Sequence, residues 1–192
     1  FEYLANESSR LANHLKNLGA GKESFTFIYL EKIPELYISI IAVLKTGSTA
    51  GPLFASFGTD AIRDRLFDSK ASIIITQSSL LSNVLEVCDY LPDLKHIIVV
   101  KQNDNNLPYS SDKSITDFRE YMHYDSWFEC EYTCADDSAL IHYTSGTTGK
   151  PKGAIHSHSS IIAHYSTTKH VLQLKDADIY WCTADPAWIT GT

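Results

Sequence analysis

Apolar residues follow two distinct patterns along the first hundred positions: helical spacing and short continuous runs. Between residues 3 and 18, apolar side chains recur every three or four positions, which predicts an amphipathic helix that Gly19 and Gly21 end. Short runs of β-branched and aromatic residues predict strands at 24–30, 49–53, 71–76 and 96–100. Between these runs the pattern predicts helices at 34–45, 60–68 and about 78–90.

The order of these elements predicts the fold class. The expected strands are apolar almost throughout rather than at alternate positions, which is typical of strands that are buried on both faces. Strands that alternate with helices indicate an α/β fold, with a mostly parallel sheet flanked by helices. The 192 residues are enough for one domain with a sizeable core.

The second half of the chain is less regular. Residues 101–113 are polar and predict a surface loop, and a short helix is expected at 114–121. Strands are expected on either side of residues 143–153, followed by a helix from 157 to about 172. An aromatic run predicts a last strand at 178–182.

Residues 143–153 form a stretch rich in glycine and hydroxyl side chains, which reads YTSGTTGKPKG. Its glycines allow the backbone to turn and to bring N–H groups close to an anion, and Lys150 and Lys152 add positive charge. Composition alone is equally typical of a flexible surface loop. An ordinary Walker A loop is excluded, because Pro151 stands where that motif requires serine or threonine.

Taken as a unit, the string resembles the phosphate-binding signature of the adenylate-forming superfamily, which includes acyl-CoA synthetases, luciferases and nonribosomal peptide adenylation domains. That signature is [YF]-T-S-G-[ST]-T-G-x-P-K-G, and every position matches. The resemblance implies that the loop binds ATP, with Lys150 and Lys152 as catalytic charges and Thr148 near a Mg²⁺ ion held by the phosphates. The ATP-binding residues that it implies are Thr144, Ser145, Gly146, Thr147, Thr148, Gly149 and Lys150.

A second segment narrows the resemblance to one branch of the superfamily. Residues 184–191 read ADPAWITG and are similar to A-D-x-G-W-[VI]-T-G, the pattern of the acetyl-CoA synthetase branch. Ala187 replaces the glycine that is usual there, which puts the tightness of the turn in question. By resemblance, Trp188, Ile189 and Thr190 line the pocket for a short acyl group. Without the resemblance, Trp188 is more simply a core residue.

An earlier segment is similar to the coenzyme A site of related synthetases. Phe54, Ala55 and Ser56 stand where those enzymes usually have Phe-Gly-Gly against the CoA nucleotide. Both glycines are replaced here, so the resemblance carries over only to Phe54 and Ser56 as CoA contacts. Residues 44–52 also resemble the family segment L-K-x-G-x-x-x-x-P, for which an architectural role is expected.

Together the resemblances imply an AMP-forming acid–thiol ligase of the acetate–CoA ligase type. The implied reaction activates acetate or a similar short-chain carboxylate to an acyl-adenylate and then transfers the acyl group to CoA. Two alternatives stay open: an adenylating enzyme with a different acid or a carrier-protein acceptor, and a binding domain without catalysis. The 192 residues lack the family's adenine pocket and small C-terminal domain. They are therefore expected to be part of the large N-terminal domain and to be inactive alone.

Charge and composition limit the class of partner. A net charge of −7 and a pI near 5.5 provide no basic surface for nucleic acid. The sequence has no apolar run of membrane-spanning length and no signal peptide, so small-molecule substrates and a cytoplasmic location are expected. The oligomeric state is not indicated. The cysteines are expected to be free thiols, with a metal site at Cys130, Cys134 and His142 as the alternative.

One cluster of charged residues and one histidine are further candidate sites. Arg63, Asp64, Arg65 and Asp68 lie at helical spacing and are expected to form a solvated helix face. His158 follows the signature at a position where the family often has a histidine, so direct substrate contact is its alternative to a surface or core role.

Overall fold

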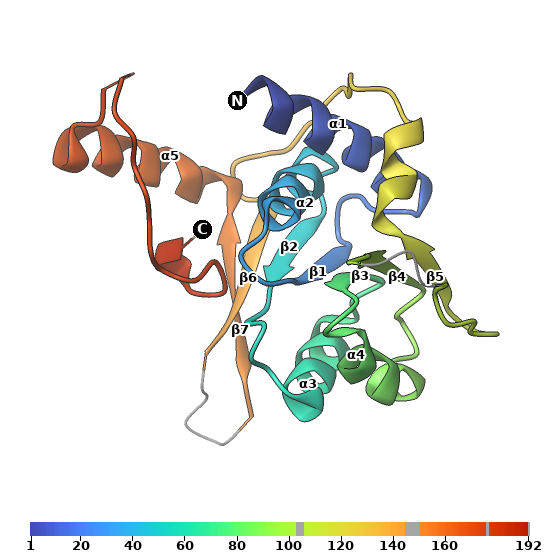
Figure 1. The fold of residues 1–192 in the computed structure, drawn as a ribbon. Coiled ribbons are helices and arrows are strands. Elements are labelled where there is room, and N and C mark those ends of the chain that lie inside the picture. The colour runs from blue at the N-terminus through green and yellow to red at the C-terminus, as the bar shows by residue number, and fades with distance from the viewer. Residues whose placement is uncertain (103–105, 145–149, 176, 192) are drawn as a thin grey trace.

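A mostly parallel sheet forms the centre of the molecule in the computed structural model, which describes residues 1–102, 106–144, 150–175 and 177–191 (Figure 1). Within these residues the strand order is β5-β4-β3-β1-β2-β6-β7. Every neighbouring pair is parallel except β6 and β7, which form an antiparallel hairpin. The strands are β1 (Phe25–Tyr29), β2 (Thr49–Pro52), β3 (Ile73–Gln77), β4 (His96–Val100), β5 (Ser114–Asp117), β6 (Ser138–Thr144) and β7 (Lys152–Ser157).

Helices cover both faces of this sheet. Figure 1 shows α1 and α2 on one face and α3 and α4 on the other. The α-helices are α1 (Glu2–Asn17), α2 (Pro34–Lys45), α3 (Thr59–Ser69), α4 (Leu81–Val87) and α5 (His158–Thr167). Shorter helical turns are η1 (Cys88–Tyr90), η2 (Phe118–His123), η3 (Thr168–Leu172) and η4 (Ile189–Gly191).

Alternate strand residues divide the core into two clusters, because successive side chains of a strand point to opposite faces of the sheet. Ile28, Ile73 and Ile75 pack with α1 and α2. Phe27 and Ile74 pack with α3 and α4. Both faces of β1 and β3 are therefore buried, which explains why their sequences are apolar throughout.

The sequence-based fold prediction is confirmed for the parallel sheet and its flanking helices, but it is wrong at two segments. Residues 114–117 form strand β5 instead of a helix, because they pair with the edge of β4, and only residues 118–123 are helical. Residues 178–182 form no strand with any described part of the chain, and Ile179 among them is 100% exposed. Both errors concern pairing between distant segments, which local composition does not determine.

α5 contributes little to the core. None of its residues is buried, and Ile161, Ile162 and Tyr165 on it are exposed. In Figure 1 the helix stands away from the sheet at the end of β7. The two core clusters therefore depend on α1–α4 and the strands. No helix in the described residues is long and apolar enough to cross a membrane.

Lys45 at the end of α2 joins that helix to α1. Its Nζ donates hydrogen bonds to the Ala5 carbonyl oxygen (3.0 Å), Ser8 Oγ (2.9 Å) and Ser9 Oγ (2.8 Å). Burial lowers the pKa of the Lys45 ammonium, but the three acceptors offset the cost of burying it. This lysine belongs to the L-K-x-G segment, so the architectural role expected for that segment has a physical basis here.

Lys45→Met is expected to lower the free energy of unfolding by about 1–3 kcal/mol, because it leaves part-buried acceptors without their donor. Urea unfolding measures the change. Lys70→Met, at an exposed lysine after α3, is the matched control and should change stability by less than about 0.5 kcal/mol. Equal effects of the two substitutions would contradict this role of Lys45.

His14 on α1 is expected to make stability depend on pH. It is 3% exposed, its ring packs on Tyr124 at 5.1 Å, and neither ring nitrogen has a hydrogen-bond partner in the described structure. Burial is the main cause that lowers the pKa of His14, against the opposing charge of Glu120, and burial also lowers the pKa of His96. The folded protein thus favours the neutral imidazole.

The sign of the pH effect follows from this lowered pKa. Above about pH 6.5 the histidine is neutral in both states, and below it the unfolded chain takes up a proton more readily. The free energy of unfolding should therefore fall as the pH drops from 7.5 to 5.5, by at most about 1.4 kcal/mol per pH unit for each such histidine. Urea unfolding at both pH values should show a shallower fall for His14→Phe than for wild type. An unchanged slope would contradict the assignment.

Candidate functional site

The candidate site lies at the carboxyl ends of β2 and β6. Ligands of parallel α/β sheets bind at this edge, where the loops that follow neighbouring strands meet. Ala50 of β2 pairs with Leu140 of β6, so the carboxyl ends of these two strands lie on the same side of the sheet. The turn at residues 185–191 also lies at this edge, because the Pro186 carbonyl oxygen is 3.4 Å from His142 Nε2 of β6.

The β6–β7 hairpin presents the signature residues. Tyr143 pairs with Gly153, and Thr144 pairs with Lys152, so the signature starts on one strand and ends on the other. Thr144, Lys150 and Lys152 are exposed at this end of the hairpin. The remaining expected phosphate contacts lie outside the described residues: Ser145, Gly146, Thr147, Thr148 and Gly149.

Gly153 has a steric reason to be glycine. A Cβ atom there would lie 2.8 Å from Ile141 Cδ1 and 3.3 Å from Tyr143 Cζ. The missing side chain thus leaves room for the Tyr143 ring to lie across the hairpin. The last glycine of the signature therefore supports the geometry of β6.

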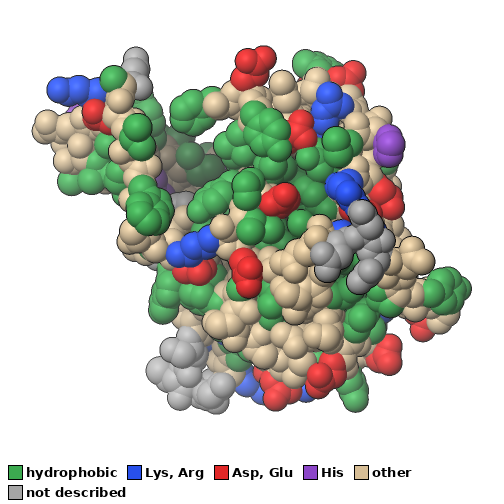
Figure 2. All heavy atoms as spheres, in the orientation of Figure 1, with side chains coloured by type: hydrophobic (Ala, Val, Ile, Leu, Met, Phe, Trp, Pro, Cys, Tyr) green, Lys and Arg blue, Asp and Glu red, His purple; other side chains and the backbone are tan. Residues whose placement is uncertain are grey.

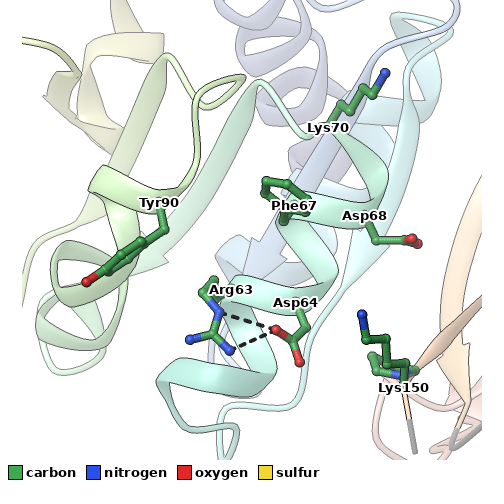
Figure 3. A pocket seen from close by; sticks show the side chains of 8 residues that line it. Arg63, Asp64, Phe67, Asp68, Lys70, Tyr90 and Lys150 are labelled. Atoms are coloured by element: carbon green, nitrogen blue, oxygen red, sulfur yellow. Dashed lines mark hydrogen bonds and ion pairs between the residues drawn. The ribbon is translucent and has the colours of Figure 1, made fainter. Parts of the chain in front are cut away.

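Lys150 borders a cavity of about 600 Å³ between the hairpin and α3. Figure 3 shows Asp64 and Asp68 projecting from α3 toward the side on which Lys150 lies. Arg63 is already engaged, at 2.9 Å from Asp60 and 3.0 Å from Asp64. On the face in Figure 2, Lys and Arg are mixed with Asp and Glu rather than gathered in one basic patch.

An aromatic row connects the loop after β2 with the turn at 185–191. The Phe54 ring packs edge-on against Trp188 at 5.5 Å and against Phe57 at 5.1 Å. The structure thus brings together the expected CoA contact Phe54 and the expected acyl-pocket residue Trp188. Trp188 is 61% exposed, which excludes a core role in the described structure, and Ser56 beside Phe54 is exposed as well.

Thr190 occupies a different position. It borders a separate recess of about 390 Å³ that it shares with His164 of α5 and with residues of η3, and its carbonyl oxygen accepts a hydrogen bond from Cys182 Sγ at 3.3 Å. The backbone of Ile189 belongs to η4. Among the described residues, Thr190 therefore borders a recess that Trp188 does not line.

The turn that carries Trp188 closes on Asp185. Asp185 Oδ1 accepts from the Ala187 N–H at 2.9 Å, and the Asp185 carbonyl oxygen accepts from the Trp188 N–H at 2.8 Å. A Cβ atom on Gly191 would lie 2.2 Å from that carbonyl oxygen, so glycine is required there. Ala187 is buried and fits this turn, so its replacement of the family's glycine does not open it.

Sequence reasoning missed one group at this site. Arg65 and Asp68 were expected on a solvated helix face, and this is wrong for the half-buried Arg65, while Asp68 is exposed as expected but also holds a partner from β6. The Tyr143 hydroxyl donates to Asp68 Oδ2 at 2.7 Å, and the Arg65 guanidinium lies 4.2 Å from the Phe57 ring centroid. The available signal was that Arg65 and Asp68 lie three apart on a side of the helix distinct from the Asp60–Arg63 pair.

Three of the cysteines and His158 lie apart from these contacts, whereas Cys182 contacts Thr190. Cys130 and Cys134 are exposed, Cys88 is buried, and all are free thiols. The described residues contain no group of three or more His, Cys, Asp or Glu side chains that could hold a metal ion. The His158 N–H donates to the Asp137 carbonyl oxygen at 3.0 Å, at the start of α5.

Comparisons with known proteins agree with the signature. The profile of the family described as "AMP-binding enzyme" matches residues 1–192. Acetyl-coenzyme A synthetase of Bacillus subtilis is 40% identical over 194 residues, which cover 100% of this chain and 33% of that protein. Acetyl-coenzyme A synthetase 2 of Pseudomonas aeruginosa is 34% identical over 194 residues, which cover 95% of this chain and 30% of that protein.

The fold agrees with a solved structure as well. The crystal structure of an acyl-CoA synthetase from Brucella canis superposes with a TM-score of 0.85 and 26% sequence identity, over 96% of this chain and 32% of that one. The chain spans about a third of the length of the curated relatives it matches.

Proposed function

Because the chain belongs to the AMP-binding enzyme family, we propose that the protein activates acetate or a similar short-chain carboxylate with ATP and transfers the acyl group to CoA. The observation that carries the proposal is the 40% identity over the whole chain to an acetyl-coenzyme A synthetase. The match of all eleven signature positions, which begin on β6 and end on β7 at the carboxyl edge of the sheet, also supports it.

The first half-reaction brings one anion onto another. A carboxylate oxygen of the acid attacks the α-phosphorus of ATP, the bond to the bridging oxygen breaks, and pyrophosphate leaves. The nucleophile is already ionised at neutral pH, so no side chain is required as a general base. The main demand on the protein is to offset the repulsion between the acid and the triphosphate.

The signature hairpin is suited to this demand. We assign the phosphates of ATP to residues 144–150, with Lys150 and Lys152 supplying positive charge at the exposed end of β6 and β7. The backbone of Lys152 is held by its pairing with Thr144, so this lysine extends from the same end of the hairpin as the first proposed phosphate contact. Mg²⁺ is assigned to the nucleotide, since this ion is usually held by phosphate oxygens and few protein ligands, and Thr148 is its proposed neighbour.

The second half-reaction transfers the acyl group. The CoA sulfur attacks the acyl carbon of the adenylate, the mixed anhydride bond breaks, and AMP leaves with the electron pair. We assign CoA to the loop at Phe54 and Ser56, and the acyl group to Trp188, Ile189 and Thr190. The contact between Phe54 and Trp188 supports the assignment of these two residues, because their rings pack 5.5 Å apart, whereas Thr190 borders a separate recess. A cytoplasmic location is proposed on the ground of these soluble substrates.

Product analysis tests the proposal. The full-length protein, incubated with acetate, ATP and CoA, should form acetyl-CoA, AMP and pyrophosphate in equal amounts. Leaving out CoA should stop turnover at enzyme-bound acyl-adenylate. Adenylate that CoA does not consume would favour a carrier-protein acceptor instead, and ADP as product would contradict the proposal.

A further inference from the structure

Tyr143 stands immediately before the proposed ATP contacts. It lies on β6, and its neighbour Thr144 is the first of those contacts. Its ring packs 6.4 Å from Phe27 of β1, and the absent side chain of Gly153 leaves space beside it. Contacts that hold Tyr143 therefore also hold the carboxyl end of β6, at which the proposed ATP contacts begin.

The Tyr143 hydroxyl is held by α3. It donates to Asp68 Oδ2 at 2.7 Å and lies 3.2 Å from the Arg65 carbonyl oxygen. Burial and the nearby Asp68 carboxylate raise the pKa of Tyr143 well above its usual range, so the phenol keeps its proton at neutral pH and remains the donor. The bond thus joins a neutral donor to a charged acceptor, which is stronger than a bond between neutral groups.

Arg65 also contacts the Tyr143 ring. Its guanidinium lies 5.6 Å from the Tyr143 ring centroid and 4.2 Å from the Phe57 centroid. Its Nη1 donates to the Ala61 carbonyl oxygen at 2.8 Å, which fixes the side chain along α3. Phe57 in turn contacts Phe54, so the support of Tyr143 continues to the aromatic row at Trp188.

We propose that Asp68 and Arg65 are positioning residues which, through Tyr143, hold the carboxyl end of β6 in the geometry that binds the phosphates of ATP. This inference rests on the function proposed above. The signature tolerates phenylalanine in place of tyrosine, so the hydroxyl bond to Asp68 is a property of this chain rather than of the motif.

Variants of the full-length protein test the proposal through the Michaelis constants in ATP–pyrophosphate exchange. Tyr143→Phe and Asp68→Ala should each raise the constant for ATP about 3- to 10-fold, which corresponds to one lost hydrogen bond. The constant for acetate should change less than about 2-fold, because the acyl group is assigned to residues 188–190 rather than to Tyr143 or Asp68. The double variant should be no worse than either single variant, since both remove the same bond.

Two matched variants separate positioning from a general structural effect. Asp68→Asn keeps an acceptor for the Tyr143 hydroxyl and should stay within about 2-fold of wild type. Asp64→Ala, one turn earlier on α3 and paired with Arg63 instead, should do the same. Thermal unfolding of each variant verifies that the assay temperature lies below the transition.

The outcomes distinguish this inference from the proposed function. If wild type exchanges and the ATP constants of Tyr143→Phe and Asp68→Ala stay unchanged, or if the acetate constant rises equally, the inference is overturned and the function stands. If the wild-type protein binds ATP but catalyses no exchange, the proposed function is contradicted. The positioning role is then tested by whether Tyr143→Phe and Asp68→Ala raise the dissociation constant for ATP. If wild type does not bind ATP, both fall.

Discussion

Gly51→Val is expected to lower the free energy of unfolding by about 3 kcal/mol, at the upper end of the usual cost of overpacking. Gly51 of β2 pairs with Phe27 of β1, and a Cβ atom at Gly51 would lie 2.7 Å from Cε1 of that ring. The Phe27 side chain is 0% exposed and packs with Tyr29 and Ile62, so the ring cannot move aside into solvent. Either the two strands separate or the core repacks.

Urea unfolding measures this effect, and two further variants make it specific. Gly21→Ala is the control, because a Cβ atom there meets only the end of Lys16 at 3.8 Å, and its cost should stay below about 1 kcal/mol. Phe27→Leu should recover part of the loss in the Gly51→Val background, since it removes the clashing ring atoms. A Gly51→Val protein as stable as wild type would show that the ring is not confined as described.

Lys150→Ala and Lys152→Ala are each expected to lower kcat/KM for ATP in pyrophosphate exchange by about 100-fold. Both lysines are exposed at the hairpin end, so neither substitution should alter the core. The loss is electrostatic, because each removes a charge that offsets repulsion between acid and triphosphate. Lys70→Ala is the control, since this lysine borders the same cavity but follows α3 instead of standing on the hairpin. Equal losses in all three variants would indicate a general charge effect rather than contact with ATP.

The parts of the fold that the sequence predicted are those in which local signals agree. The helix expected at 34–45 is α2 (Pro34–Lys45), because Pro34 favours a helix start and the apolar run that follows must be buried. The strand expected at 96–100 is β4 (His96–Val100), because its run of β-branched residues favours a strand and is buried. The prediction for residues 114–117 was wrong because their strand exists only through pairing with β4.

The same distinction holds at the candidate site. The signature string is contiguous, so its residue types and spacing were sufficient to predict the strands on either side of it, β6 and β7. The contact of Tyr143 with Asp68 joins residues 75 positions apart, and no pattern of spacing predicts it. The contact between Phe54 and Trp188 likewise depends on how the loop after β2 and the turn at 185–191 meet.

The central claim is that the signature hairpin serves the activation of a short carboxylic acid. The most direct test is carboxylate-dependent ATP–pyrophosphate exchange by the full-length protein with acetate, propionate, butyrate and a long-chain acid. Exchange that is greatest with acetate or propionate is the predicted result. Exchange with none of the acids, or only with the long-chain acid, would contradict the claim.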